Sequence, residues 1–348
     1  MSTQKALWLP KIGAQFTLGR NAIPEPGPGE ALVKLKASAL NHMDVHIQQS
    51  GFFEIKEYPV ILGEEGAGVV VKVGDGVRNL ARGDNVLFQA TFNNKYGSFQ
   101  EYCVVLAEIA VKIPPNLSYE EAASILIAFA PFAVATYAQR PQGIALTPPF
   151  EEGGLGKYAG RPIVIFGGAA SVGQQAIQLA TLSGFSPIIT TASLHHEDLL
   201  LSLGATHVID RKLPNGALIK RVRELVVAPL GYIFDAVSVK DTQHAGYALL
   251  APGGTLAVVG PPQVGREDDG RGKKVIMVLG SFHLPPNRAL GATFAIALTR
   301  WLQEGKIKSN RVEVVPGGLN GVVPGLRQLA RGVSATKLVV CPPETIYV

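Results

Sequence analysis

The pattern with the clearest chemistry is a glycine-rich turn that follows the apolar run Ile163–Phe166. The run predicts a buried strand, and the helically spaced apolar residues from Val172 onward predict a helix. Gly167 and Gly168 permit a tight turn between the two, and Gly173 permits close packing of the helix against the strand. Because the first N–H groups of a helix are unpaired and lie at the positive end of its dipole, this turn is predicted to bind a pyrophosphate.

A tight turn that binds no ligand is the alternative, because the middle glycine of the G-x-G-x-x-G pattern is missing and Ala170 lies near its place. The surrounding sequence favours binding, since a predicted strand precedes the turn, a predicted helix follows it and further apolar runs come later. The candidate cofactor-binding residues here are Gly167, Gly168, Ala169, Ala170, Ser171, Val172 and Gly173, and Gly260 is added to them.

The residues after the second apolar run, Pro187–Thr191, indicate which dinucleotide the turn would bind. An Asp or Glu at the end of this strand would bind the ribose 2′-hydroxyl of NAD, but this sequence has Ser193, His195 and His196 instead. A hydroxyl, an imidazole and the guanidinium of Arg211, which ends the third run, can donate hydrogen bonds to a 2′-phosphate. The sequence therefore predicts NADP(H) as the cofactor, with surface-loop residues that bind nothing as the alternative.

Six apolar runs alternate with helical segments in the middle of the chain. Continuous apolar strands of this kind indicate a parallel sheet covered by helices on both faces. Six strands is the number found in a Rossmann dinucleotide-binding sheet, so the predicted fold class is α/β with a doubly wound parallel sheet. The runs are Pro162–Phe166, Pro187–Thr191, His207–Ile209, Tyr232–Val237, Thr255–Val259 and Val275–Leu279.

The two ends of the chain follow a different pattern. Short apolar runs such as Glu30–Lys36 and Ala67–Val73, separated by Gly and Pro, predict an antiparallel, barrel-like domain near the N-terminus. Toward the C-terminus, the pattern predicts a helix over Leu290–Gln303 and a strand over Lys337–Val340 that returns to that first domain. The expected domains are residues 1–125 together with 291–348, and residues 126–290.

Composition excludes several classes of function. Of the 348 residues, 47% are hydrophobic and 17% charged, which allows a large buried core and argues against disorder. The net charge is +5 but Lys and Arg are scattered, so no nucleic-acid partner is expected. The longest uncharged run, Ala122–Ala138, contains Pro131 and indicates a buried helix rather than a membrane span. With only Cys103 and Cys341, no disulfide framework is expected, and a reducing, cytoplasmic location is the simplest interpretation.

Several motifs together carry a resemblance to a known family: Leu62–Val70, Gly74–Asp84, Gly167–Gly173, Leu203–Ala205, Gly253–Leu256 and Lys337–Val340. On these motifs the chain resembles the medium-chain dehydrogenase/reductase superfamily over nearly its whole length. The resemblance implies a GroES-like β-barrel catalytic domain, residues 1–125 and 291–348, around a Rossmann NADP-binding domain, with hydride transfer from the nicotinamide in the cleft between them. The closest branch is similar to quinone reductases and to fungal enoyl reductases, including stand-alone ones that serve polyketide synthases.

The chain departs from the zinc-dependent members of that superfamily. Those members have a Cys where this chain has Asn41 and a His where it has Glu64, and the loop Gln89–Glu101, which would hold a four-Cys zinc site, contains no Cys. Because zinc requires about four N, S or O ligands in a tetrahedral array, no metal is expected. His42 and His46 have the i,i+4 spacing that could face a metal from a helix, but no third ligand is apparent nearby.

The resemblance implies reduction of a polarised C=C bond by NADPH without zinc, in an enone, a quinone or an enoyl thioester. Such a reaction needs a proton donor. Some relatives use a Tyr near Phe53, and many have Lys or Tyr where this chain has His46. His46 is therefore the expected donor, and Asn41 is expected to hold the ribose or nicotinamide of the cofactor. The alternative is that His46 only lines the pocket and water supplies the proton.

Two other functions stay open at this stage. One is carbonyl or alcohol oxidoreduction, for which no electrophile that would polarise the oxygen is apparent without zinc. The other is a non-catalytic NADP(H)-binding protein. The expected partner is a small-molecule substrate, free or presented by a carrier protein, with neither nucleic acid nor a membrane, and the sequence is compatible with a monomer or a homodimer.

Overall fold

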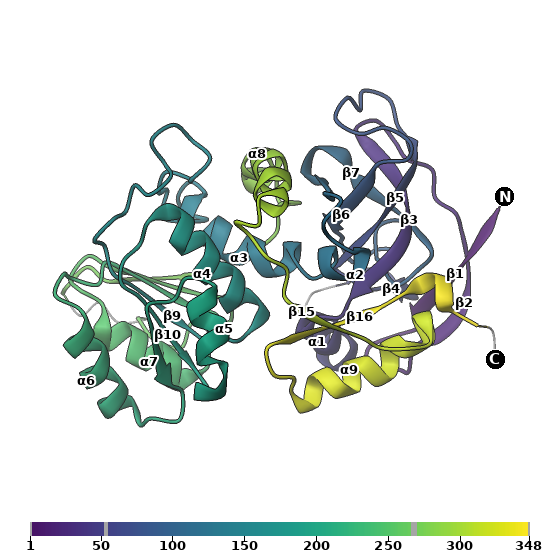
Figure 1. Cartoon of the computed structure of the whole chain (residues 1–348). Coiled ribbons are helices and arrows are strands. Elements are labelled where there is room, and N and C mark those ends of the chain that lie inside the picture. Colours follow the sequence, from purple (N-terminus) through teal and green to yellow (C-terminus); the bar gives the residue numbers. More distant parts are fainter. Residues whose placement is uncertain (1, 52–54, 266–269, 347–348) are drawn as a thin grey trace. The chain divides into compact units, whose positions relative to one another are not determined.

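A computed structural model describes residues 2–51, 55–265 and 270–346 (Figure 1). The chain forms two compact units, one made of Met1–Ile127 with Gly291–Val348 and the other of Ala128–Leu290. The sequence interpretation places the boundaries at 125/126 and 290/291. The described residues form three sheets, two in the first unit and one in the second.

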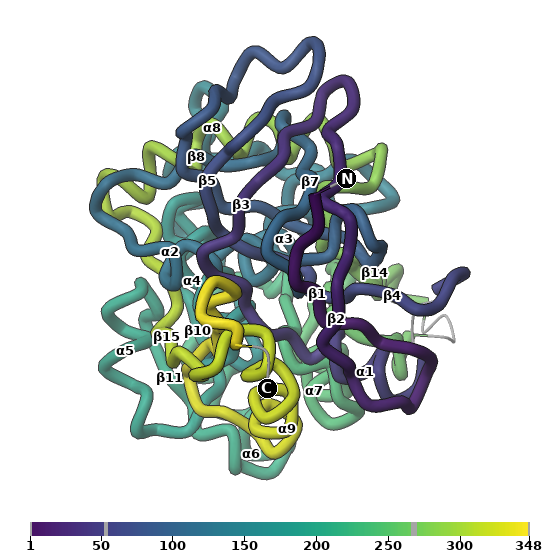
Figure 2. Tube along the Cα trace, turned by 90° about the vertical axis from the view of Figure 1, so that its right-hand side faces the viewer, coloured from purple at the N-terminus to yellow at the C-terminus, as the bar shows by residue number. Residues whose placement is uncertain are grey.

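The first unit is built on two sheets. The larger one has the order β15-β16-β3-β5-β6-β8, with β7 also paired to β3, and the smaller one has the order β2-β1-β4. β1 and β2 run side by side near the N-terminus (Figure 2). Antiparallel pairing of Val339 with Ala39 puts the C-terminal strand β16 beside β3, so the predicted return of the tail to the first domain is confirmed. The strands are β1 (Thr3–Leu9), β2 (Thr17–Ala22), β3 (Glu30–Ala39), β4 (Val60–Ile61), β5 (Glu65–Val73), β6 (Asn85–Gln89), β7 (Tyr102–Leu106), β8 (Val111–Lys112), β15 (Arg311–Val314) and β16 (Thr336–Val340).

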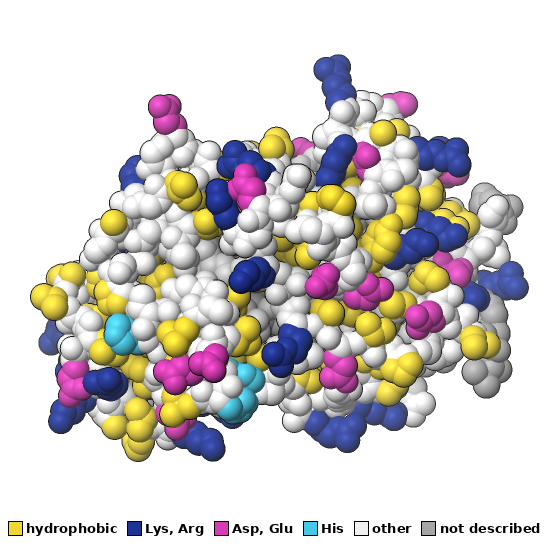
Figure 3. Space-filling model, viewed as in Figure 1, with side chains coloured by type: hydrophobic (Ala, Val, Ile, Leu, Met, Phe, Trp, Pro, Cys, Tyr) yellow, Lys and Arg dark blue, Asp and Glu magenta, His cyan; other side chains and the backbone are white. Residues whose placement is uncertain are grey.

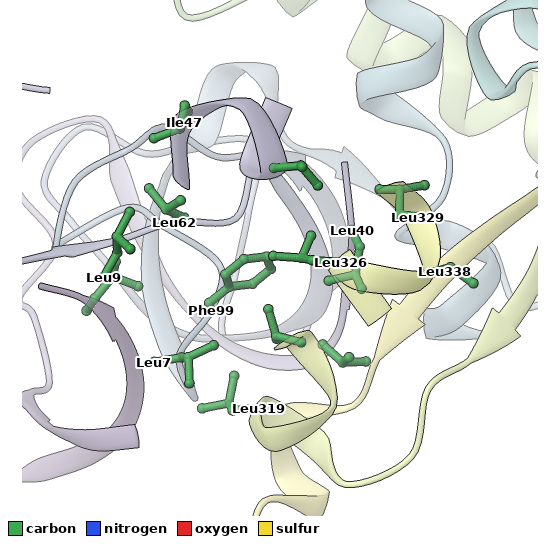
Figure 4. Close-up of a cluster of buried hydrophobic side chains, with 14 of the residues drawn as sticks. Leu7, Leu9, Leu40, Ile47, Leu62, Phe99, Leu319, Leu326, Leu329 and Leu338 are labelled. Carbon is green, nitrogen blue, oxygen red and sulfur yellow. The ribbon is translucent and has the colours of Figure 1, made fainter. Parts of the chain in front are cut away.

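In this unit, a buried apolar cluster joins helices α1 (His42–Ser50) and α9 (Val322–Arg331) to strands β1 and β16 (Figure 4). Ile47 of α1, Leu326 of α9 and Leu338 of β16 belong to it, and each is at most 7% exposed. Phe99 is fully buried among them. Since burying one such side chain contributes about 1.5–3 kcal/mol, the cluster holds α1 firmly and fixes the residues at its N-terminal end.

The second unit contains a six-stranded parallel sheet with the order β11-β10-β9-β12-β13-β14. Counted along the chain, this order is 3-2-1-4-5-6, that of a dinucleotide-binding sheet. All six predicted strands are present, so the doubly wound parallel sheet is confirmed. The strands are β9 (Ile163–Phe166), β10 (Ile188–Ala192), β11 (His207–Asp210), β12 (Tyr232–Asp235), β13 (Thr255–Val258) and β14 (Lys274–Met277). Across both units, the other helices of the described residues are α2 (Tyr119–Ala122), α3 (Leu126–Tyr137), α4 (Ser171–Ser183), α5 (Glu197–Ser202), α6 (Asn215–Leu225), α7 (Lys240–Leu249) and α8 (Pro285–Gln303).

Two helices bear on predictions made from the sequence. Within the described residues, Tyr119–Tyr137 is the helical stretch that is long and apolar enough to cross a membrane. However, 72% of its most apolar segment is buried inside the protein, as in a core helix.

The last long helix, α8, begins at Pro285 and not at the predicted Leu290. The prediction was wrong because proline is favoured in the first turn of a helix, where its missing N–H needs no partner.

Charged side chains of both signs are spread over the face of the protein shown in Figure 3. Lys and Arg lie among Asp and Glu there rather than in a continuous basic stripe. With a net charge of +5, this is the distribution of a solvated surface.

Candidate active site

The glycine-rich turn of the second unit joins β9 to α4, in the predicted strand–turn–helix arrangement. Gly167 has a φ of 77°, a left-handed conformation that favours glycine, and its N–H donates to Thr191 Oγ1 at 3.1 Å. The N–H of Gly168 donates to the carbonyl oxygen of Thr191 at 3.0 Å. These bonds tie the turn to β10. Helix α4 then begins at Ser171, after Ala170, and the helix itself supplies no acceptors for the N–H groups of its first turn.

Two glycines of the turn leave no room for a side chain. A Cβ at Gly173 would lie 2.1 Å from the carbonyl oxygen of Gly167, and a Cβ at Gly168 would lie 2.2 Å from Thr190 Oγ1. Glycine at 168 therefore lets the turn pass close to β10, and glycine at 173 lets α4 pack closely against the residues that follow β9, which is the role that the sequence assigns to Gly173. The approach puts the first turn of α4, including Val172, at the carboxyl end of β9, where parallel sheets bind dinucleotides.

The four residues predicted to contact a 2′-phosphate lie near the carboxyl ends of β10 and β11. Arg211 Nε donates to Ser193 Oγ at 2.9 Å. The rings of His195 and His196 are 4.0 Å apart between centroids and are inclined by 51°. His195 and Arg211 are exposed, and Ser193 and His196 are half-buried. The structure thus gathers a hydroxyl, a guanidinium and two imidazoles at one edge of the sheet.

Gly260 lies after β13, against the loop that follows β12. A Cβ at Gly260 would be 3.1 Å from the Cβ of Ser238, whose backbone has a φ of 58°. Asp235 holds this loop, because its Oδ1 accepts the N–H groups of Val237 and Ser238 at 2.9 and 2.8 Å and its Oδ2 accepts the Thr242 hydroxyl at 2.6 Å. Burial raises the pKa of the Asp235 carboxyl, against the effect of these hydrogen bonds. The sequence interpretation missed Asp235, although an acid at the end of a buried strand was a visible signal.

A buried charged cluster occupies the first unit. The Lys337 ammonium lies 2.8 Å from Glu65 Oε1 and donates to Asn41 Oδ1 at 2.5 Å. Asn41 Nδ2 donates to Glu65 Oε1 at 3.3 Å, and the backbone N–H of Ile127 donates to Glu65 Oε2 at 2.9 Å. The side chains of Lys337 and Glu65 are 7% and 1% exposed. A buried ion pair of this kind persists because additional hydrogen bonds satisfy its charged atoms.

Helix α1 adds Asp44 to this cluster. Its Oδ2 accepts the N–H of Asn41 at 3.0 Å, and its Oδ1 accepts the N–H of Gly63 at 3.1 Å. Burial raises the pKa of Asp44 to about 7, although these two N–H groups and the charge of Lys337 act to lower it. Asp44 therefore ties the start of α1 to the turn before β5.

Glu64 lies immediately before β5 and is half-buried. Burial, followed by the carboxyl groups of Asp44 and Glu65, raises the pKa of Glu64 well above its usual range, and Lys337 opposes this only in part. The Glu64 side chain makes no hydrogen bond or ion pair with any of the described residues, 2–51, 55–265 and 270–346. Among the described residues, Glu64 is thus the acid of the cluster whose carboxyl group has no hydrogen-bond partner.

The two residues predicted to be catalytic have different surroundings. Asn41 is 7% exposed and its amide is used within the charged cluster. His46 is exposed on α1, and so is His42 one turn earlier. Partial burial of the His42 ring, with the charges of Lys337 and His46, lowers its pKa. Phe53, where some relatives have a Tyr, lies outside the described residues.

The side chains at the positions compared with zinc enzymes do not fit zinc. Asn41 Oδ1 already binds the Lys337 ammonium, a cation that would repel a metal ion at the same oxygen. Asn41 and Glu64 also provide neither the thiolate nor the imidazole that catalytic zinc most often takes. In the described part of the chain, no group of three or more His, Cys, Asp or Glu side chains could hold a metal ion.

Like Asp235, Lys337 and Asp44 are candidate residues whose roles were not predicted from the sequence. The role of Lys337 could have been suspected because a charged residue begins the otherwise apolar run Lys337–Val340. Its partner Asn41 is 296 positions away, and no local pattern connects the two.

Two family models match this chain. One, described as the alcohol dehydrogenase GroES-like domain, matches residues 27–115. The other, described as zinc-binding dehydrogenase, matches residues 171–283. The matched ranges fall in the first and the second unit, respectively.

Several fungal proteins match nearly the whole chain, including a dehydrogenase and a trans-enoyl reductase. Dehydrogenase orsE of Emericella nidulans is 32% identical, over 98% of this chain and 99% of its own. Trans-enoyl reductase himH of Aspergillus japonicus is also 32% identical, over 97% of this chain and 96% of its own. Among solved structures, the crotonyl-CoA carboxylase/reductase AntE in complex with NADP has a TM-score of 0.77 at 19% identity, over 99% of this chain and 96% of that one. At that identity the likeness shows a shared fold.

Proposed function

Because the chain belongs to the medium-chain dehydrogenase/reductase superfamily and is an oxidoreductase, we propose that it uses NADPH to reduce a polarised C=C bond. The substrate class is an enone, a quinone or an enoyl thioester. The likeness to trans-enoyl reductase himH over almost the entire chain supports this reaction.

The contact between Arg211 Nε and Ser193 Oγ, at 2.9 Å, is the observation that carries the choice of NADPH. It presents a cation and a hydroxyl at the end of β10, where the 2′-phosphate of the cofactor would lie. The first turn of α4 supports a pyrophosphate in the same unit, because its N–H groups have no acceptors within the helix and Gly173 lets this turn pack closely against the residues that follow β9. The residues present therefore fit this cofactor.

The reaction divides between the cofactor and the protein. A bound reduced nicotinamide supplies a hydride to the β-carbon of the substrate. The protein has to hold the two reactants in line, exclude water and deliver a proton where the former π electrons accumulate. The sequence predicts His46 as the proton donor, and the structure leaves this residue exposed on α1.

We also propose that the reaction requires no metal, since the side chains at Asn41 and Glu64 do not suit zinc. The substrate is a small molecule, free or bound to a carrier protein, and the protein acts in the cytoplasm as a monomer or homodimer. Activity is expected to survive prolonged dialysis against a chelator.

A substrate panel tests the proposed function. The dialysed protein is mixed with NADPH and an enone, a quinone or an aldehyde, and NADPH oxidation is followed by absorbance. Turnover of enones or quinones, but not of aldehydes, supports the proposal. Turnover of aldehydes alone would identify a carbonyl oxidoreductase, and tight NADPH binding without turnover would identify a binding protein. One zinc per chain whose removal abolishes activity would contradict metal independence.

A further inference from the structure

The charged cluster of the first unit contains more acid than base. Asp44, Glu64 and Glu65 bring three carboxyl groups together, while Lys337 is the cation whose charge acts on both Asp44 and Glu64. If every group were ionised, the acids would outnumber the base by two charges. His42 does not supply a compensating positive charge, because its lowered pKa favours the neutral imidazole. Uncompensated like charges are costly away from water, so at least one carboxyl group keeps its proton.

Hydrogen-bond partners indicate which carboxyl group that is. Glu65 Oε1 faces the Lys337 ammonium at 2.8 Å and the Asn41 amide at 3.3 Å. Asp44 accepts one backbone N–H on each oxygen. Donors of this kind favour the ionised form of an acid. Glu64 has no such donor among the described residues, so the proton resides on Glu64.

Glu64 is also the acid of this cluster that is open to a small molecule. The side chain of Glu65 is 1% exposed and Asp44 is fully buried, whereas Glu64 is half-buried. The backbone around Glu64 is fixed, because its carbonyl oxygen accepts the N–H of Ala90 at 2.5 Å. The preceding Gly63 has a φ of 95°, and a Cβ there would lie 2.3 Å from Ser98 Oγ. A fixed main chain therefore presents a protonated carboxyl group at the surface of the cluster.

We propose that Glu64, rather than His46, is the acid that donates the proton to the substrate. This inference rests on the proposed reduction of a C=C bond. The hydride from NADPH forms a C–H bond at the β-carbon, and the π electron pair moves onto the α-carbon and its conjugated carbonyl group. That electron pair then forms a second C–H bond at the α-carbon with the proton of Glu64. The O–H bond of Glu64 breaks, Glu64 becomes a carboxylate, and solvent returns the proton before the next turnover.

The surroundings of Glu64 predict how the reaction depends on pH. The titratable and charged groups that face the cluster are Asp44 and His42 from α1, Glu65 from β5 and Lys337 from β16. Because the cluster has more acid than base and Glu64 has no donor among the described residues, Glu64 is the group expected to hold a proton at neutral pH and to lose it as the pH rises, and its pKa is raised in the same direction. Turnover is therefore expected to fall on the alkaline side, and this fall is expected to be absent in Glu64→Gln.

The protonation state can be tested without cofactor or substrate. Infrared difference spectra of the protein at neutral and alkaline pH should show the C=O band of a protonated carboxyl group, lost as the pH rises. The part of this band that comes from Glu64 should be missing from Glu64→Gln, in which Asp44 with its pKa of about 7 supplies the remaining signal, and the full band should be retained in Glu25→Gln, which removes an exposed surface carboxylate. A band of equal intensity in the wild type and in Glu64→Gln would overturn the assignment.

Turnover tests the role of this proton. Glu64→Gln is expected to lower the rate of enone reduction about 100-fold while leaving NADPH affinity unchanged, as for the loss of a general acid. Glu64→Asp is expected to recover part of the rate, and Glu25→Gln to match the wild type. Thermal unfolding of each variant shows whether it has folded.

Two results would contradict Glu64 as the donor. One is a Glu64→Gln rate within about threefold of the wild type with the alkaline fall intact. The other is a 100-fold loss in His46→Phe with none in Glu64→Gln. A wild-type protein that reduces no enone or quinone at all would instead defeat the proposed function, and the infrared band would still report on Glu64.

Discussion

The glycine-rich turn of the second unit and the charged cluster of the first unit are held in place by different forces. In the turn, Gly168 and Gly173 act by having no side chain, and the residues that shape it are neighbours in sequence or lie on the adjoining strand β10. In the cluster, Lys337 binds Asn41 and Glu65, which are far away along the chain. The glycine-rich turn should therefore be disrupted by substitutions that add side-chain atoms. The charged cluster should be disrupted by substitutions that remove one of two paired charges.

Removing the lysine should have the largest effect. Lys337→Met leaves Glu65 buried without its cation, and we expect the free energy of unfolding to fall by about 3–5 kcal/mol, measured by urea denaturation. The matched control is Lys72→Met, which breaks an ion pair with Glu25 whose side chains are 56% and 74% exposed. That variant should lose less than about 1 kcal/mol.

A second substitution sharpens this test. In the double variant Lys337→Met/Glu65→Gln, the uncompensated negative charge is gone, so part of the lost stability should return. If Lys337→Met were as stable as Lys72→Met, the buried pair would not be what organises the cluster.

Adding one methyl group to the turn should have the next largest effect. Gly173→Ala places a Cβ 2.1 Å from the carbonyl oxygen of Gly167, so α4 must move away from β9. We expect a loss of about 1–3 kcal/mol in stability, together with weaker NADPH binding in a fluorescence titration. Gly216→Ala, near the start of α6, is the matched control because a Cβ there meets nothing within 4 Å. An equal effect of the two substitutions on NADPH binding would show that close packing of α4 does not shape the cofactor site.

The smallest of these effects concerns cofactor choice. Arg211→Ala removes the guanidinium beside Ser193, and we expect NADPH to bind on the order of tenfold more weakly, with little change for NADH. Arg221→Ala is the control, since Arg221 pairs with Glu224 on the exposed face of α6. Equal dissociation constants of the wild type for NADPH and NADH would remove the basis for assigning Arg211 to the phosphate.

The difference between local contacts in the glycine-rich turn and long-range contacts in the charged cluster explains what could be predicted from the sequence. The six strands and the glycine-rich turn follow from local hydrophobic periodicity and from positions where a side chain cannot fit, so they were predicted close to their observed bounds. The charged cluster arises when β16 pairs with β3, which puts Lys337 beside Asn41, and contacts across 296 positions have no local pattern. The sequence therefore pointed to Asn41 as a cofactor contact, while the structure shows its amide bound to Lys337 and Glu65.

We propose that this protein transfers hydride from NADPH to a C=C bond and needs no metal to do so. The most direct measurement uses NADPH with deuterium at the transferred position of nicotinamide C4, an α,β-unsaturated ketone and protein dialysed against a chelator. NMR of the product should show deuterium on the β-carbon and an intact carbonyl group. Deuterium on the carbonyl carbon of an alcohol product, or transfer that begins only after zinc is added, would contradict the claim.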